Sequence, residues 1–266
     1  MKYPEIDPIA FSIGPIMGFS KDIHWYGLMY LFTFLICWAI CLYRTRQPWS
    51  PLKKDQVEDL IFYIAVGVIL GGRLGYGLFY GMAQWSQDVL WILKLWTGGM
   101  SFHGGLIGVL FAIWCYGRKI NQSTFDIVDW GIACVPIGLF LGRIGNFIGQ
   151  ELWGRATEMP WGIVFPYDAS QLSRHPSQLY EAFFEGIILF LILFLFSMKK
   201  RPRYAMSGMF LVGYGVFRAG IEFFREPDSH IMFDMFGWMT RGQILCVPMI
   251  LVGSWLLWYS YRSNRT

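Results

Sequence analysis

Residues 142–154 read Gly-Arg-Ile-Gly-Asn-Phe-Ile-Gly-Gln-Glu-Leu-Trp-Gly, and they directly follow the apolar run 130–141. That run is apolar enough to be buried, yet an arginine, an asparagine and a glutamate come soon after it. Polar and charged groups in or beside hydrocarbon are costly unless they are paired or used, so each of these side chains needs a partner or a function. We interpret the segment as a set of hydrogen-bonding groups at the end of a membrane helix.

The composition of the whole chain is that of an integral membrane protein. It is 55% hydrophobic and only 15% charged, whereas soluble proteins are about a quarter charged. The 5 cysteines lie in apolar runs without a CxxC pair, so we expect buried thiols and neither a disulfide nor a metal site. No cleavable leader is expected, because the first apolar patch is short and broken by prolines.

Apolar runs predict about seven transmembrane helices. The runs cover approximately residues 26–43, 60–80, 102–116, 125–141, 179–198, 207–224 and 243–261. Residues 1–23 and 91–100 are expected to form short interfacial arms. Residues 146–175 are too polar to span, so we expect them to form a small periplasmic head within one integral membrane domain, 1–266. The predicted fold class is an all-α polytopic membrane protein.

Clusters of lysine and arginine set the predicted orientation. They follow the first, third, fifth and seventh runs, within residues 44–54, 118–119, 199–203 and 262–265. By the positive-inside rule these ends are cytoplasmic, which leaves the N-terminus outside and the C-terminus inside. Residues 146–175, residues 225–242 and the start of the third run would then meet on the outer face. No internal repeat is visible, so a transporter built from duplicated halves gains no support.

Ionisable residues at the ends of these runs are the first candidates for a functional site. His103 opens the third run among glycines, where its ring could exchange a proton or bond a backbone group at the helix start. Arg143 could clamp a phosphate with two hydrogen bonds, or it could snorkel to the interface. Asn146 and Glu151 could orient Arg143 or bind the hydroxyl groups of a lipid head group.

The sixth run carries a charged stripe. It is made of Tyr214, Arg218, Glu222 and Arg225, spaced four, four and three residues apart. This spacing places the four side chains on one face of a helix, where they should face the bundle interior and pair with each other. Two arginines against one glutamate leave a positive charge that a lipid phosphate would neutralise. A purely structural ion pair is the alternative.

Three further residues on the predicted outer side have open roles. Arg73 could belong to the same site as Arg143 and the charged stripe, or it could donate hydrogen bonds to loop carbonyls. Tyr26 could contact a substrate or belong to the aromatic belt of the membrane interface. His175 could hold the outer loop against the bundle. The sequence contains no P-loop, GxSxG, HExxH or paired-cysteine pattern, and no serine or cysteine stands beside a base, so a nucleophile would arrive with a substrate.

The segment 142–154 resembles the signature of the prolipoprotein diacylglyceryl transferase family, Gly-Arg-x-Gly-Asn-Phe-x-Asn-x-Glu-x-x-Gly. The matching residues are Gly142, Arg143, Gly145, Asn146, Phe147, Glu151 and Gly154. Gly149 departs from the family's asparagine, which removes any hydrogen bond that its side chain makes. The resemblance extends through residues 24–27, 71–76, 101–105, 174–181 and 217–225. It therefore covers nearly the whole chain.

The resemblance implies a seven-helix enzyme of the bacterial inner membrane. Members transfer the diacylglyceryl group of phosphatidylglycerol to the thiol of the lipobox cysteine of a prolipoprotein, and they release glycerol phosphate. We expect no cofactor, no metal and no nucleic-acid partner. The residues expected to be catalytic are His103, Arg143 and Arg218. Those expected to bind substrate are Tyr26, Arg73, Asn146, Glu151, Glu222 and Arg225.

The expected mechanism assigns His103 as acceptor of the thiol proton, while Arg143 and Arg218 hold the phosphate and stabilise the leaving group. The competing account is that the arginines alone lower the pKa of the thiol. A transporter or flippase for an anionic lipid would also explain intramembrane arginines. It predicts polar residues along a path through the bilayer, whereas here they gather toward the outer half. A non-catalytic lipid-binding protein would leave His103 without a role.

Overall fold

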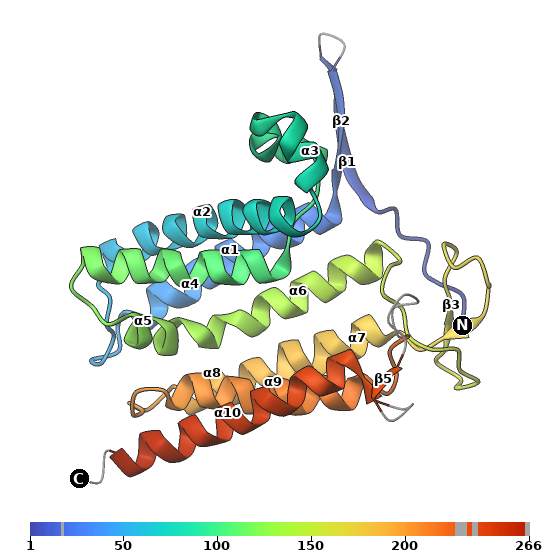
Figure 1. The fold of residues 1–266 in the computed structure, drawn as a ribbon. Helices are drawn as coiled ribbons and strands as arrows, with labels where there is room; N and C mark the ends of the chain where they lie inside the picture. Colours follow the sequence, from blue (N-terminus) through green and yellow to red (C-terminus); the bar gives the residue numbers. More distant parts are fainter. Residues whose placement is uncertain (17–18, 227–232, 236–238, 264–266) are drawn as a thin grey trace. The chain divides into compact units, whose positions relative to one another are not determined.

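The computed structural model describes residues 1–16, 19–226, 233–235 and 239–263, and most of them are helical (Figure 1). The chain divides into two compact units. The first comprises Met1–Cys37 and Gly131–Thr266, and the second comprises Trp38–Trp130. Within the described residues, five helices are long and apolar enough to cross a membrane. These are Trp25–Arg44, Lys54–Phe79, Thr124–Ile148, Ser177–Phe196 and Arg241–Ser263.

The first unit is built mainly from helices that follow the predicted apolar runs. They are α1 (Trp25–Arg44, shared with the second unit), η3 (Ile132–Cys134), α6 (Val135–Ile148), α7 (Ser177–Glu181), η4 (Ala182–Ile188), α8 (Leu189–Phe196), α9 (Ala205–Ile221) and α10 (Arg241–Ser263). The segment η4 is a π-helix that joins α7 to α8. An added Cβ at Gly186 would lie 2.6 Å from the Cβ of Phe140, so glycine permits the close packing of η4 on α6.

The mainly helical structure agrees with the predicted all-α membrane fold, and short strand pairs are added to it. Within the segment predicted as a short interfacial arm at 1–23, β1 (Ile9–Ile16) and β2 (Phe19–His24) make an antiparallel hairpin. Two smaller antiparallel pairs are β3 (Ile163–Val164) with β4 (Ser173–Arg174), and β5 (Phe233–Met235) with β6 (Met239–Thr240). The structure is thus mainly helical with three two-stranded sheets among its described residues.

The segment after α6 packs on its own apolar cluster in the first unit. Tyr3, Phe147, Ile163 and Phe165 are buried together, with Ile6, Trp153 and Leu179 against them. The Tyr3 hydroxyl donates to the backbone oxygen of Phe147 at 3.1 Å, and Lys2 pairs with Val164 in a parallel bridge. The head predicted at 146–175 therefore begins after α6 ends at Ile148, and the N-terminal residues belong to it.

The second unit is organised around two closely packed helices, α2 (Lys54–Phe79) and α4 (Phe102–Lys119). An added Cβ at Gly108 would lie 2.1 Å from the backbone oxygen of Gly67, so only small residues allow this approach. Along the chain, α2 and α4 are connected by α3 (Met82–Gln87), η1 (Val89–Leu93) and η2 (Leu95–Thr97). These three short helices cover most of the arm predicted at 91–100. The unit ends in α5 (Thr124–Gly131), which continues into η3 and α6.

Candidate active site

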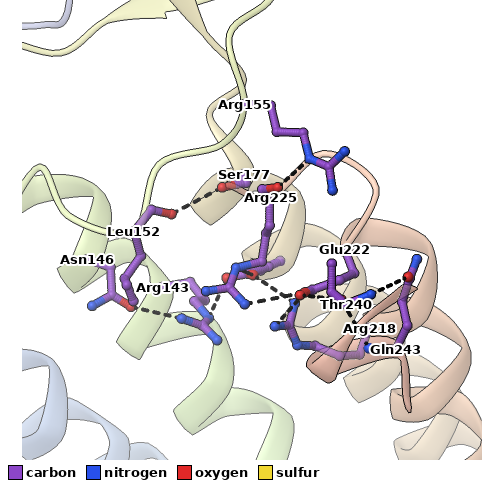
Figure 2. Close-up of polar contacts among 11 residues, drawn as sticks. Arg143, Asn146, Leu152, Arg155, Ser177, Arg218, Glu222, Arg225, Thr240 and Gln243 are labelled. Carbon is purple, nitrogen blue, oxygen red and sulfur yellow. Dashed lines mark hydrogen bonds and ion pairs between the residues drawn. The ribbon is translucent and has the colours of Figure 1, made fainter. Parts of the chain in front are cut away.

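Three arginines of the first unit, which are labelled in Figure 2, form ion pairs with one buried carboxylate. The carboxylate belongs to Glu181 at the end of α7, and its side chain is 0% exposed. Its Oε2 lies 2.7 Å from Nε of Arg143 on α6. Its Oε1 lies 3.3 Å from Nη1 of Arg218 on α9 and 3.2 Å from Nε of Arg225, just after α9. Glu181 thereby joins three segments that are far apart in the sequence.

Glu222 is the second carboxylate of this cluster. Its Oε2 lies 2.7 Å from Nη2 of Arg218 and 3.3 Å from Nη1 of Arg225. Its Oε1 accepts a hydrogen bond of 2.9 Å from the hydroxyl of Thr240, next to the start of α10. The side chain of Gln243 accepts from the backbone N–H of Thr240 at 3.1 Å and so completes the first turn of α10. Figure 2 shows Glu222 between the arginines and this turn.

A short polar chain extends the cluster toward the head. Nη1 of Arg143 donates to Oδ1 of Asn146 at 3.3 Å, and Nδ2 of Asn146 donates to Oε1 of Glu151 at 2.7 Å. The backbone oxygen of Glu151 accepts from Gln178 at 2.7 Å. Leu152 adopts a left-handed φ of 58°, which is unusual for a non-glycine residue and turns the chain sharply after α6. Arg143, Asn146 and Glu151 are therefore held as one unit.

The cluster keeps unused hydrogen-bond donors. The side chains of Arg143, Arg218 and Arg225 are 20%, 12% and 15% exposed. Among the described residues, Nη2 of Arg143 and Nη2 of Arg225 make no hydrogen bond or ion pair. Three guanidiniums also face only two ion-paired carboxylates, so one positive charge is left over. The sequence analysis counted two arginines, Arg218 and Arg225, against Glu222. The structure adds Arg143 and Glu181 to the ion pairs, so the excess of positive over negative charge among the ion-paired residues is unchanged.

The head is attached directly to Arg225. Gly154 and Arg225 form an antiparallel bridge, and Nε of Arg155 donates to the backbone oxygen of Arg225 at 2.7 Å. An added Cβ at Gly154 would lie 2.4 Å from the backbone oxygen of Phe224. Glycine is therefore required at this position, and the end of the signature segment positions the third arginine.

His175 and Asp168 stabilise the head. The backbone oxygen of His175 accepts from the N–H of Gly154 at 2.9 Å, and its Nδ1 lies 3.1 Å from the Tyr180 hydroxyl. Burial lowers the pKa of His175, so the neutral ring is favoured. Burial alone would raise the pKa of Asp168, but hydrogen bonds from Arg174 and Ser170 outweigh it and the pKa is lowered. These contacts agree with the interpretation that His175 holds the outer loop.

Tyr26 lies beside the same turn of α6. An added Cβ at Gly145 would lie 2.8 Å from Cδ2 of Tyr26, so the ring covers the residue next to Asn146. The Tyr26 and Tyr30 hydroxyls are 3.2 Å apart, and Tyr26 is 39% exposed. The phenol is thus placed near the polar chain and is accessible from outside it.

Arg73 lies in the second unit and has a clear structural role there. Its side chain donates to the backbone oxygens of Trp91, Ile92, Lys94, Gly98 and Gly99 and to the Thr97 hydroxyl. It is only 2% exposed, and its guanidinium lies 4.2 Å from the centroid of the Trp91 ring. Of the two predicted roles, these contacts support bonding to loop carbonyls.

His103 also lies in the second unit, in the first turn of α4, and is exposed. The Ser101 side chain caps this helix by accepting from the N–H of Gly104 at 3.2 Å. The ring of His103 contacts Phe102 edge-on, with centroids 5.6 Å apart. Its approach to the arginines of the first unit stays a prediction.

Sequence reasoning identified Glu222 but missed two other buried glutamates, Glu181 and Glu185. Glu181 and Glu185 are both 0% exposed, and both lie in the apolar run at 179–198. Two carboxyls four residues apart at the start of a membrane helix were the available signal, because ionisable groups there need partners. Thr240 and Gln243 gave no comparable signal, since uncharged polar residues are common at helix starts.

Together these features define a polytopic membrane protein with a partly buried arginine–glutamate cluster at the ends of its helices. The family model described as prolipoprotein diacylglyceryl transferase matches residues 8–259, and the chain belongs to this family.

Curated relatives agree over nearly the full length. The phosphatidylglycerol–prolipoprotein diacylglyceryl transferase of Teredinibacter turnerae is 55% identical over 267 residues, covering 98% of this chain and 93% of that protein. The protein of the same name from Coxiella burnetii is 52% identical over 263 residues, with 99% and 98% covered. That from Acinetobacter baumannii is 51% identical over 269 residues, with 99% and 96% covered.

Proposed function

We propose that this chain transfers the diacylglyceryl group of phosphatidylglycerol to the thiol of the lipobox cysteine of prolipoproteins, the first step of bacterial lipoprotein maturation. The observation that carries the proposal is the arginine–glutamate cluster in a chain of this family. The names of the relatives supply the two substrates, phosphatidylglycerol and a prolipoprotein.

The phosphodiester of the lipid binds at the cluster. It carries one negative charge, which matches the positive charge left by the two ion-paired carboxylates. The spare Nη2 groups of Arg143 and Arg225 can donate to its oxygens, and a guanidinium can bind two phosphate oxygens at once. Glu181 and Glu222 hold the arginines in place before the lipid arrives, so little reorganisation is needed on binding.

The reaction exchanges one bond for another at the glyceryl carbon that bears the phosphate. The cysteine sulfur forms a C–S bond to this carbon while the C–O bond to phosphate breaks, and glycerol phosphate leaves. The proton that leaves the thiol is carried away by the products, so the total charge is the same before and after the reaction. Negative charge gathers on the departing phosphate, where Arg143 and Arg218 stabilise it. His103 accepts the thiol proton in this proposal.

The other predicted residues shape the site around the phosphate. Asn146 and Glu151 form a polar chain next to Arg143 that can bind the hydroxyls of the glycerol head group. The exposed phenol of Tyr26 lies over the same turn of α6 and can contact substrate. Arg73 contributes indirectly, by holding the arm at 91–99.

We propose a seven-span topology with the site facing the periplasm. The five long helices are joined by α4 and by α9, an apolar helix of 17 residues. Basic residues at the ends of α1, α4 and α10 favour a cytoplasmic position for these ends. The N-terminus is then outside, the C-terminus is cytoplasmic, and residues 146–175 form a periplasmic head of one domain in the inner membrane.

The test is transfer by the purified chain. Vesicles containing phosphatidylglycerol, mixed with a lipobox peptide and no energy source, should yield a peptide whose mass has increased by one diacylglyceryl group, together with free glycerol phosphate. A peptide with serine in place of cysteine should stay unmodified. Movement of phosphatidylglycerol between leaflets without peptide modification would indicate a flippase and contradict the proposal.

The role of His103 has a separate test in the same assay. His103→Gln should slow transfer and alter its dependence on pH, because the proton acceptor is lost. Near-normal turnover with an unchanged pH profile would remove His103 as the base and favour the arginines alone as activators of the thiol.

A further inference from the structure

Glu185 is a buried carboxyl that the proposed mechanism does not use. It lies in the π-helix η4, one turn after Glu181, and is 0% exposed. Neither of its side-chain oxygens has a hydrogen-bond partner among the described residues. An ionised carboxylate without donors is costly in such a place, so Glu185 must either take up a proton or have its charge matched by nearby cations. Short π-helical turns also occur frequently at functional sites.

The charged and titratable groups near Glu185 include residues of α6 and α9, which pack against η4. Those that interact with it electrostatically are Glu181 on its own helix, Arg143 on α6, Arg218 and Tyr214 on α9, Arg225 after α9, and Cys246 on α10. All three arginines of the cluster are in this set. Glu185 is therefore close enough to the ion pairs for its charge to depend on the charge of the cluster.

The charge of the cluster can be balanced in two ways. Glu181 and Glu222 leave one positive charge among the three arginines. In the empty site an ionised Glu185 supplies the missing negative charge. In the occupied site the phosphodiester supplies it, and an ionised Glu185 would then leave an excess negative charge in a poorly solvated place.

We propose that Glu185 balances the charge of the arginine cluster by taking up a proton when a phosphodiester binds and releasing it when the phosphodiester leaves. The inference rests on the proposed function, because it takes the cluster as the site of the lipid phosphate. It adds a proton linkage to substrate binding that the ion pairs alone do not provide.

The experiment measures protons taken up on binding. Dihexanoyl phosphatidylglycerol is titrated calorimetrically into the purified full chain, at one pH, in buffers of different ionisation enthalpy. The wild-type chain should take up about one proton per lipid in the pH range between the titration of Glu185 in the empty site and its titration in the occupied site, and across that same range its Kd should rise by up to about tenfold per pH unit. Glu185→Gln should bind the lipid with no proton uptake and with a Kd that does not change with pH.

Two variants separate this role from a structural one. Glu185→Asp keeps the carboxyl and should retain the proton uptake. Glu158→Gln removes an exposed carboxylate of the head and should behave like the wild type. If Glu185→Gln does not fold, Glu185→Asp tests the role of this residue instead. Its shorter side chain places the carboxyl differently, so the pH at which the chain takes up a proton on binding lipid should shift.

The outcomes distinguish the two proposals. Lipid binding by the wild type without proton uptake would overturn the role of Glu185 and leave the proposed function intact. Proton uptake that is unchanged in Glu185→Gln would assign the proton to another group and also overturn it. Failure of the wild type to bind phosphatidylglycerol at all would overturn both.

Discussion

Replacing Glu181 by glutamine tests the arginine cluster most severely. The side chain is 0% exposed and lies 2.7 Å from Arg143, 3.3 Å from Arg218 and 3.2 Å from Arg225. Glutamine keeps the shape and one acceptor oxygen but removes the negative charge. Arg143 would keep only the neutral side chain of Asn146, while Arg218 and Arg225 would still share Glu222. The three guanidiniums would then repel one another more strongly, because Glu222 would be the one carboxylate still ion-paired with them among the described residues.

The size of the effect follows from burial. Breaking a buried ion pair by removing one partner costs about 3–5 kcal/mol, and the lower end applies here because the arginines keep some exposure. A loss of about 3 kcal/mol corresponds to a fall in Tm of about 6–12 °C for a chain of this size. Saturating phosphatidylglycerol should recover part of the loss, because its phosphodiester restores a negative charge to the cluster.

The assay is thermal unfolding of the purified chain in detergent, with and without phosphatidylglycerol. Glu158→Gln, on the exposed surface of the head, is the matched control and should leave Tm unchanged. A Glu181→Gln variant with the Tm of the wild type would refute the claim that Glu181 holds the arginines together. Equal stabilisation of both chains by the lipid would refute the link between the cluster and the lipid phosphate.

Three further predictions concern single contacts. Arg143→Lys should lower kcat/KM for peptide lipidation by about 10²–10³-fold, mainly in kcat, because a lysine cannot present the guanidinium fork to the departing phosphate; a change confined to KM would contradict a role in the transition state. Arg73→Gln should release the arm at 91–99, seen as amide hydrogen exchange at least about tenfold faster there, with phosphatidylglycerol affinity unchanged; a loss of affinity without faster exchange would restore Arg73 as a substrate ligand. Because burial lowers the pKa of His175, the unfolded chain binds the extra proton first, so stability is full above the ordinary value of 6.5 and falls as pH drops below it; His175→Phe should remove this part of the pH dependence of Tm, and parallel profiles for the two chains would argue against it.

Much of the helical framework could be predicted from the sequence because its cause is local. Apolar runs of sufficient length form membrane helices whatever their partners are. The spacing of Arg218 and Glu222 also predicted their ion pair, which is confirmed at 2.7 Å. Arg225 was expected on the same helical stripe, but α9 ends at Ile221 and a turn brings the side chain to the carboxylates. The convergence was right although the local structure differs.

The parts that could not be predicted depend on contacts between distant segments. Glu181 pairs with arginines from α6 and α9, and no local pattern indicates which helix faces will meet. The hairpin of β1 and β2 was not predicted, because the mixed polar and apolar residues 1–23 indicated only a short interfacial segment. The role of Arg73 was left open because loop carbonyls give no signal in a sequence.

The central claim is that the arginine cluster binds the phosphodiester of the lipid through hydrogen bonds and ion pairs during transfer. An experimental structure of the chain with phosphatidylglycerol bound tests it most directly. The account predicts phosphate oxygens about 2.7–2.9 Å from guanidinium nitrogens of Arg143 and of Arg218 or Arg225. A head group bound away from these arginines, with the ion pairs to Glu181 undisturbed and no phosphate contact, would contradict it.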